Sequence, residues 1–297
     1  MARNKNQHWV PDSYLRAWVD LNTPAGHEPF VHLFDRKGGN HRRRSPGNIM
    51  KKPELYTIFR GKERDLSIED HFAQKIEPEF IRVRALIESA GHVGMQEVAA
   101  LYGFVAAMIA RPPRQIEHMK QHWARIFQKA RNIRIRSNVQ MPPTLVSGPK
   151  IALEEIQQMA SDPMGTWFPD FVNANINVIS QRFGCDILIN ESPHPFLTSD
   201  NPAVICFPNS RGNERRMVPR GLGSRGCEIT MPISPRFALR FSHRPPGLYD
   251  WITLGWEGVF DINFRTITKA HETIVSDCED LFFVQTIVDR VAAVDSA

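Results

Sequence analysis

The chain has 297 residues, of which 42% are hydrophobic and 23% charged, and 37 Lys and Arg against 32 Asp and Glu give a formal charge of +5. This composition excludes collagen, coiled-coil, wholly disordered and disulfide-framework proteins. No apolar run reaches the roughly 18 residues that span a bilayer. Residues 1–8 are polar, unlike a signal peptide, so we expect a cytoplasmic protein without a membrane anchor.

The N-terminal half is expected to be mainly helical with one short β-hairpin. Strands are expected where apolar residues alternate beside turn sequences, and helices where they recur every three or four residues. The expected strands are 30–34 and 55–58, and the expected helices are 7–18, 67–87, 96–110 and a segment from Arg111-Pro112-Pro113-Arg114 to about 130. Pro78 lies inside one of these patterns and predicts a kink or break there. The helix at 96–110 is apolar on nearly all sides, which predicts a central position.

The C-terminal half changes from helices to strands. Residues 138–148 are rich in Pro, Ser, Thr and Gly and are expected to form a loop or hinge. The expected helices are 153–161, 169–179 and 263–275, and the expected strands are 186–189, 203–206, 228–232, 237–241 and 281–286. This order predicts an α+β fold, with a central helical bundle packed on a mostly antiparallel sheet. We expect one elaborated domain over 1–297, or a sub-division into a helical part at 1–148 and a sheet-rich part at 149–297.

Positive charge is concentrated in two segments. Segment 36–64 contains ten Lys and Arg, and segment 111–136 contains eight against a single acid, Glu117. Such segments are typical of a surface that binds nucleic acid phosphates, and equally of a solvated helix face. The four cysteines have no C-x-x-C spacing, which favours core thiols in a reducing compartment over a zinc site.

Three groups of polar residues are candidates for a site. Gln7 and His8 precede the first predicted helix, and His8 is either a base or a residue that fixes the N-terminal segment. Asp200 and Asn201 lie in a turn between two predicted strands, where they either bind a ligand or hydrogen-bond their own backbone. Glu77 shares a helix face with Asp70, and such acids either hold a divalent ion or are solvated.

Two arginines form a fourth candidate. Arg111 and Arg114 follow the central apolar helix. Cations are favoured at the C-terminal end of a helix whatever the function, and a partly buried Arg also suits bidentate capture of a phosphate or carboxylate.

The order of these motifs resembles the bacterial family catalogued as domain of unknown function 4238. The segments that carry the resemblance are Gln7-His8-Trp9-Val10-Pro11, Tyr14-Leu15-Arg16, Ile76-Glu77, Arg111-Pro112-Pro113-Arg114, Thr198-Ser199-Asp200-Asn201-Pro202 and Pro232-Ile233-Ser234-Pro235. Trp18 stands where the family usually has Phe, and Pro78 is an unusual neighbour of Glu77. The resemblance spans nearly the whole chain. It implies a single unit whose polar motif residues form a site, and it implies no particular reaction.

These residues support a leading hypothesis and two alternatives. In the leading one the protein is a nuclease-like hydrolase of phosphodiesters, in which Asp200 and Glu77 hold Mg²⁺ or Mn²⁺ and His8 is the general base. The residues expected to bind its substrate are Gln7, Arg16, Arg111, Arg114 and Asn201. The first alternative is a non-catalytic module that binds nucleic acid or an acidic protein through segments 36–64 and 111–136, with the same residues as a structural polar network. The second is a small-molecule hydrolase or binder.

Overall fold

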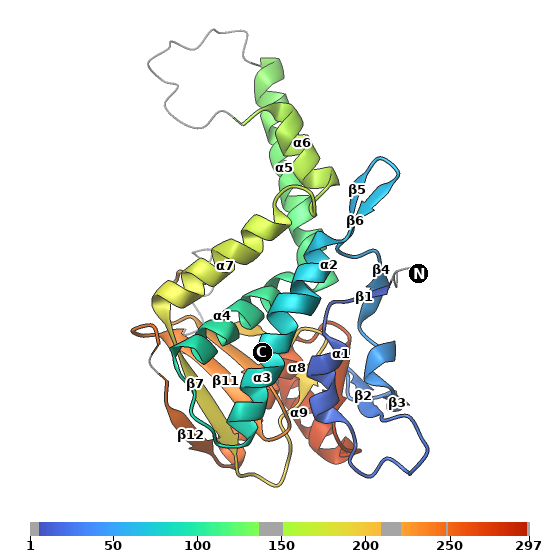
Figure 1. The fold of residues 1–297 in the computed structure, drawn as a ribbon, viewed down its shortest axis with the longest axis vertical. Coiled ribbons are helices and arrows are strands. Elements are labelled where there is room, and N and C mark those ends of the chain that lie inside the picture. Colours follow the sequence, from blue (N-terminus) through green and yellow to red (C-terminus); the bar gives the residue numbers. More distant parts are fainter. Residues whose placement is uncertain (1–5, 137–150, 209–220, 248, 296–297) are drawn as a thin grey trace.

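The computed structural model describes residues 6–136, 151–208, 221–247 and 249–295 (Figure 1). Apart from the four-residue α1, its α-helices are α2 (Ser67–His71), α3 (Glu77–Glu88), α4 (Met95–Ala110), α5 (Pro113–Arg136), α6 (Leu153–Ser161), α7 (Phe168–Arg182), α8 (Trp256–Lys269) and α9 (Leu281–Asp295). The short ones are α1 (Asp12–Leu15), the 3-10 helices η1 (Arg16–Trp18) and η2 (Pro46–Asn48), and a π-helix, η3 (Phe72–Ile76). Among these residues, no helix is long and apolar enough to cross a membrane.

Two sheets form most of the β structure. The strands are β1 (Asn6–His8), β2 (Val31–Asp35), β3 (Arg42–Arg44), β4 (Lys51–Pro53), β5 (Ile58–Arg60), β6 (Glu63–Asp65), β7 (Phe183–Asn190), β8 (Thr198–Ser199), β9 (Val204–Cys206), β10 (Glu228–Pro232), β11 (Phe237–His243), β12 (Trp251–Leu254) and β13 (Thr273–Ser276). A five-stranded sheet has the order β12-β7-β11-β10-β9, and a four-stranded sheet has the order β3-β2-β13-β8. Of the described pairings, β12 with β7 is parallel and the others are antiparallel. The α+β prediction is confirmed.

The core forms where α3 and α4 meet the N-terminal segment and the five-stranded sheet. The Phe80 ring stacks on Phe104 with centroids 3.7 Å apart, and the fully buried Tyr14 ring lies 6.0 Å from both. The same hydrophobic cluster includes Ile187 of β7 and Phe241 of β11, so it draws on both halves of the chain. Cys185 and Cys227 are buried free thiols, as expected for core residues, whereas the free thiols Cys206 and Cys278 are only partly buried.

The N-terminal segment differs from the single helix expected over 7–18. Its first residues form β1, whose Gln7 and His8 pair with Lys52 and Lys51 of β4. Helix α1 begins only after Pro11, whose extended backbone separates strand from helix. Long-range pairing therefore overrides the local helical pattern. The strand expected over 55–58 is also shifted, because only its last residue enters β5.

Two predictions near the C-terminus are wrong. The helix expected over 263–275 is α8, which begins earlier and ends at Lys269, and β13 follows it. The strand expected over 281–286 is the start of α9. Its buried residues Phe283, Val284, Ile287 and Val288 recur at helical spacing in one apolar cluster, and a short apolar run by itself does not separate strand from helix.

Pro78 lies at the junction of two helical segments. It follows Glu77 at the start of α3, directly after the π-helix η3, so the predicted irregularity is present as a widened turn. Proline has no backbone N–H to donate to the preceding turn, which favours such a change. Helices α5 and α6 lie against each other and extend away from the rest of the molecule in Figure 1. The loop expected at 138–148 lies outside the described residues.

Candidate functional site

Arg111 is the centre of a buried polar network. Its side chain follows the last residue of α4 and is 1% exposed. Nη1 lies 2.8 Å from Glu77 Oε1, and Nη2 donates to the carbonyl oxygen of His8 at 2.5 Å. The guanidinium carbon lies 4.5 Å from the centroid of the Phe72 ring and 5.4 Å from that of Tyr56. The charge of Arg111 is therefore balanced inside the protein, where it joins β1 to α3.

Gln7 extends this network to the segment after β4. Its side chain is buried, Oε1 accepts the Tyr56 N–H at 2.6 Å, and Nε2 donates to Thr57 Oγ1 at 3.3 Å. The Tyr56 hydroxyl in turn donates to the carbonyl oxygen of Arg111 at 3.0 Å. The Gln7 side chain therefore uses both its oxygen and its nitrogen in hydrogen bonds within the protein.

The His8 ring lies at the edge of the network and is partly buried. Its Nε2 lies 3.3 Å from the carbonyl oxygen of Gly47, which the neutral ring contacts as a donor. Burial lowers the pKa of His8. A neutral ring held in this way has a lone pair on Nδ1, so the geometry is compatible with the predicted base and equally with a purely structural histidine.

Glu69 belongs to the same region and was not identified from the sequence. Its Oε2 is buried and has no hydrogen-bond partner among the described residues. Burial raises the pKa of Glu69 to about 7, with the Glu77 and Asp70 carboxylates acting in the same direction and Arg111 opposing them. A carboxyl group that titrates near neutral pH therefore lies beside the Arg111–Glu77 pair.

Asp200 has a different set of partners. Its carboxylate accepts the backbone N–H groups of His271 and Glu272, both at 2.8 Å, and of Thr273 at 3.3 Å. Its carbonyl oxygen accepts the Trp9 Nε1–H at 3.2 Å. Asp200 thus fixes the segment that leads into β13.

The remaining predicted residues are spread over the surface. Arg16 is exposed and pairs with Asp12 at 2.8 Å. Asn201 Nδ2 donates to the carbonyl oxygen of Lys269 at 2.9 Å. Arg114 is exposed in the first turn of α5.

The structure therefore brings together part of the predicted site. Gln7, His8, Glu77 and Arg111 share one network, and Trp9, which follows His8, connects it to the backbone carbonyl oxygen of Asp200. The carboxylates of Glu77 and Asp200 bind separate protein partners. A shared metal ion between these two acids, and the catalytic roles of these residues, stay predictions.

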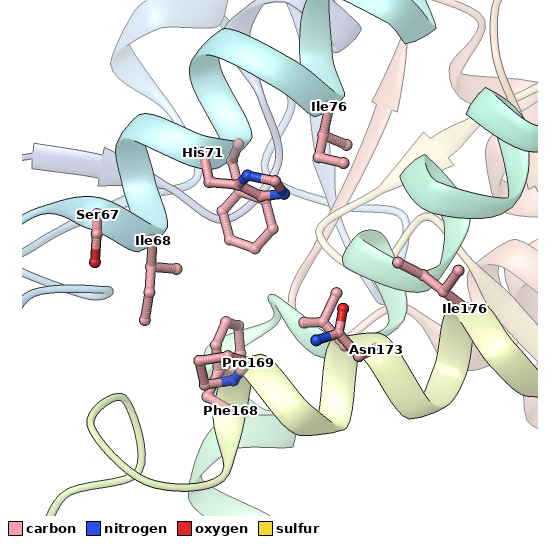
Figure 2. A pocket seen from close by; sticks show the side chains of 10 residues that line it. Ser67, Ile68, His71, Ile76, Phe168, Pro169, Asn173 and Ile176 are labelled. Atoms are coloured by element: carbon pink, nitrogen blue, oxygen red, sulfur yellow. The ribbon is translucent and has the colours of Figure 1, made fainter.

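A cavity of about 320 Å³ lies beside this network (Figure 2). The Phe72 ring, whose centroid lies 4.5 Å from the guanidinium carbon of Arg111, is also part of the cavity wall. Most of the wall is apolar, and Figure 2 shows His71 of α2 and Asn173 of α7 as polar groups on its two sides. The cavity has room for a small, largely apolar molecule.

A second polar cluster, which no motif in the sequence indicated, lies at the four-stranded sheet. His32 on β2 is 1% exposed, and its Nδ1 lies 2.8 Å from His41 Nε2. His41 Nδ1 lies 3.4 Å from Glu279 Oε1, and His32 Nε2 lies 2.9 Å from Asp20 Oδ2. Burial lowers the pKa of His41.

The sheet explains why these residues meet. His32 is directly opposite Arg43 of β3 and Ser276 of β13. His41 lies just before β3, two residues from Arg43, and its ring reaches the His32 ring on the neighbouring strand. Glu279 follows three residues after Ser276. Because Glu279 lies far from the two histidines in the sequence, no local motif indicates that the three residues meet.

Comparison with curated proteins and with solved structures found no significant match. A family model described as protein of unknown function (DUF4238) matches residues 6–280, which cover Gln7, Arg111, Asp200 and both polar clusters. The chain therefore belongs to this family.

Proposed function

We propose that this protein binds nucleic acid phosphates through one face of α5. The exposed residues Arg114, His118, Arg125 and Lys129 follow one another at spacings of four and seven. These spacings place them on one side of a helix, over a length of roughly 22 Å at about 1.5 Å per residue. This basic stripe is the observation that carries the proposal.

The packing of α5 supports an outward orientation of the stripe. Ile116, Met119 and Trp123 recur on the opposite side of the helix, in an apolar cluster that includes Met159 of α6. Trp123 is therefore a packing residue. Because the apolar side holds α5 on its neighbours, the basic side is left to solvent.

Arg114, at the start of the stripe, acts electrostatically on the same histidine as Arg36 of the first half of the chain. Burial lowers the pKa of His271, and the charges of Arg114 and Arg36 lower it further against the opposing effect of Asp200. The two arginines therefore lie close enough to His271 to act on it. Arg36 belongs to the second basic segment, 36–64, so one cation from each predicted segment acts on the same histidine.

The contacts of the buried polar network around Arg111 favour a nucleic acid binding protein over a hydrolase. Arg111 binds Glu77 and the His8 carbonyl oxygen through its two Nη groups, although its Nε–H has no hydrogen-bond partner among the described residues, and the Asp200 carboxylate accepts three backbone N–H groups. A group that binds substrate needs free donors, acceptors or charge, whereas the α5 stripe has exposed charges. The phosphodiester hydrolase stays a prediction that the same experiment addresses.

The test is fluorescence anisotropy with labelled single-stranded RNA, single-stranded DNA and duplex DNA over a range of salt concentrations. The variant is Arg125→Gln/Lys129→Gln, and the matched control is Arg225→Gln/Arg290→Gln, which removes two exposed charges elsewhere. We expect the α5 variant to weaken binding at least tenfold and to lower the salt slope on duplex DNA by about two, at roughly 0.9 per lost phosphate contact. The control should bind as the unmodified protein does.

Two outcomes would overturn the proposal: no binding at low salt, or equal losses in both double variants. Gel analysis of the same oligonucleotides after incubation with Mg²⁺ or Mn²⁺ addresses hydrolysis separately. Cleavage that disappears in His8→Ala, with unfolding unchanged, would support the catalytic prediction.

A further inference from the structure

The cluster on the four-stranded sheet combines two imidazoles and one carboxylate. One ligand atom each from His32, His41 and Glu279 lies within 4.8 Å of the other two. Among the residues that the structure describes, no other group of three or more such side chains meets this spacing. We propose that these three residues bind one divalent transition-metal ion.

The distances fit a metal centre after small side-chain shifts. Ligands bound at about 2.1 Å around a tetrahedral ion are roughly 3.4 Å apart. His41 Nδ1 and Glu279 Oε1 are 3.4 Å apart, which matches two ligands of one ion, whereas the 2.8 Å contact to His32 Nδ1 is made by the other His41 nitrogen, Nε2. An ion bound by His32 Nδ1 therefore replaces the His32–His41 hydrogen bond, and the His41 ring must turn so that one of its nitrogens faces the ion together with Glu279.

The outer contacts leave the required lone pairs available. His32 Nε2 lies 2.9 Å from Asp20 Oδ2, so the ring donates its proton there and Nδ1 keeps a lone pair. Asp20 is fixed in turn, because its Oδ1 accepts the Asn22 N–H at 2.8 Å. A carboxylate on the far nitrogen of a ligating histidine is the usual outer contact of protein metal sites.

Glu279 divides its two oxygens between two partners. Its Oε2 accepts from Arg43 Nη2 at 2.8 Å, whereas Oε1 faces His41. Arg43 thus holds the carboxylate in place and leaves one oxygen for the ion. The Glu279 side chain is 43% exposed and that of His41 is 18% exposed, so an ion can reach the cluster from solvent.

The ligand set selects the class of metal. Imidazole suits Zn²⁺, Cu²⁺, Fe²⁺ and Ni²⁺, whereas Mg²⁺, Ca²⁺ and Mn²⁺ prefer oxygen ligands. Three protein ligands leave at least one coordination position for water or a substrate oxygen, as in catalytic zinc sites. This centre differs in place and metal class from the Mg²⁺ or Mn²⁺ site predicted at Glu77 and Asp200. It goes beyond the proposed nucleic acid binding, and either can fail without the other.

Metal titration of the untagged full-length protein tests the proposal. The protein is stripped with a chelator and titrated with Co²⁺, followed by visible absorption, and with Zn²⁺, followed by calorimetry, with Mg²⁺ as the negative control. We expect one equivalent of Co²⁺ or Zn²⁺ per chain, a visible Co²⁺ spectrum of low coordination number, and no heat from Mg²⁺ at the same concentrations.

The variants His41→Ala and Glu279→Gln should weaken binding at least tenfold. Asp20→Asn should keep the stoichiometry but weaken affinity by roughly 10- to 100-fold, as loss of an outer carboxylate does. These positions are used because His32 is fully buried and its replacement would also affect folding. The matched control is His194→Gln, which removes a histidine paired with one carboxylate, Asp280, at 2.9 Å.

Two results would overturn the proposal. One is the absence of Co²⁺ and Zn²⁺ binding in the unmodified protein, which would leave a hydrogen-bonded histidine pair. The other is stoichiometric binding that persists unchanged in both His41→Ala and Glu279→Gln, which would place the ion elsewhere.

Discussion

Arg111 Nη1 lies 2.8 Å from Glu77 Oε1, although the two residues are 34 positions apart in the chain. The Arg111 side chain is 1% exposed and that of Glu77 is 20% exposed, so the pair is largely removed from water. Two opposite charges in such a place stabilise each other, and removal of either one leaves the other without compensation. The pair also holds strand β1 in place, because the same guanidinium donates a hydrogen bond to the His8 carbonyl oxygen.

Arg111→Met is therefore expected to destabilise the protein by about 3–5 kcal/mol, the usual cost of breaking a buried ion pair from one side. Urea unfolding measures the change. The double variant Arg111→Met/Glu77→Gln removes both charges and should recover part of the loss. If Arg111→Met unfolded at the same urea concentration as the unmodified protein, the pair would not hold the fold together.

Asp200→Ala removes the acceptor for the N–H groups of residues 271–273 and should cost about 2–3 kcal/mol, as expected for hydrogen bonds to a charged group. Hydrogen exchange gives a local readout, since the amides of His271 and Glu272 should exchange faster. The neighbouring variant Asn201→Ala loses one hydrogen bond at the surface and should change stability by less than about 1 kcal/mol. Unchanged exchange in Asp200→Ala would refute this structural role.

Glu69 should make stability depend on pH. Its folded-state pKa is raised to about 7, above the value of about 4.5 in an unfolded chain, so the folded state binds this proton more tightly. The contribution is fully present below pH 4.5 and is lost as the pH rises through 7. Because the group is partly exposed, we expect a loss on the order of 1 kcal/mol.

Glu69→Gln should remove this dependence, so that the variant is more stable than the unmodified protein at pH 8 and nearly equal to it at pH 5. Thermal unfolding at both pH values measures the difference. A matched substitution at Glu97 would have a different sign, because the hydrogen bond from Arg82 lowers the pKa of that carboxyl group. Equal pH profiles for Glu69→Gln and the unmodified protein would contradict the raised pKa.

Tyr14→Phe tests how the N-terminal segment is fixed to the sheet. The Tyr14 hydroxyl is fully buried, donates to the Pro232 carbonyl oxygen at 2.6 Å and lies 2.7 Å from Thr198 Oγ1. Its removal leaves buried polar atoms without a partner, which should cost about 1–3 kcal/mol. Denaturant unfolding measures this cost, and a neutral result would mean that water replaces the hydroxyl.

Part of the candidate site was predictable because its residues lie in local motifs. Gln7, His8, Glu77 and Arg111 were identified from the sequence, and the structure places them in one network. Their partners were not predictable. That Glu77 would be bound by Arg111, and Asp200 by backbone N–H groups, follows from packing between segments far apart in the chain.

The sequence by itself determined the elements whose pattern is long and regular. Helix α4 is apolar on nearly every side, and the structure buries it in the core, while the basic residues of α5 recur at a spacing that puts them on one face. Hydrophobic periodicity is a local property, so it is readable from neighbouring residues alone.

Only the tertiary structure decided the short elements and the histidine cluster. Gln7 and His8 became a strand because β4 pairs with them, and the run from Leu281 became a helix because its apolar residues pack in the C-terminal cluster. His32, His41 and Glu279 meet because β2 lies between β3 and β13. Strand order and register depend on contacts between distant segments, and a single sequence without those contacts does not specify which side chains will face each other.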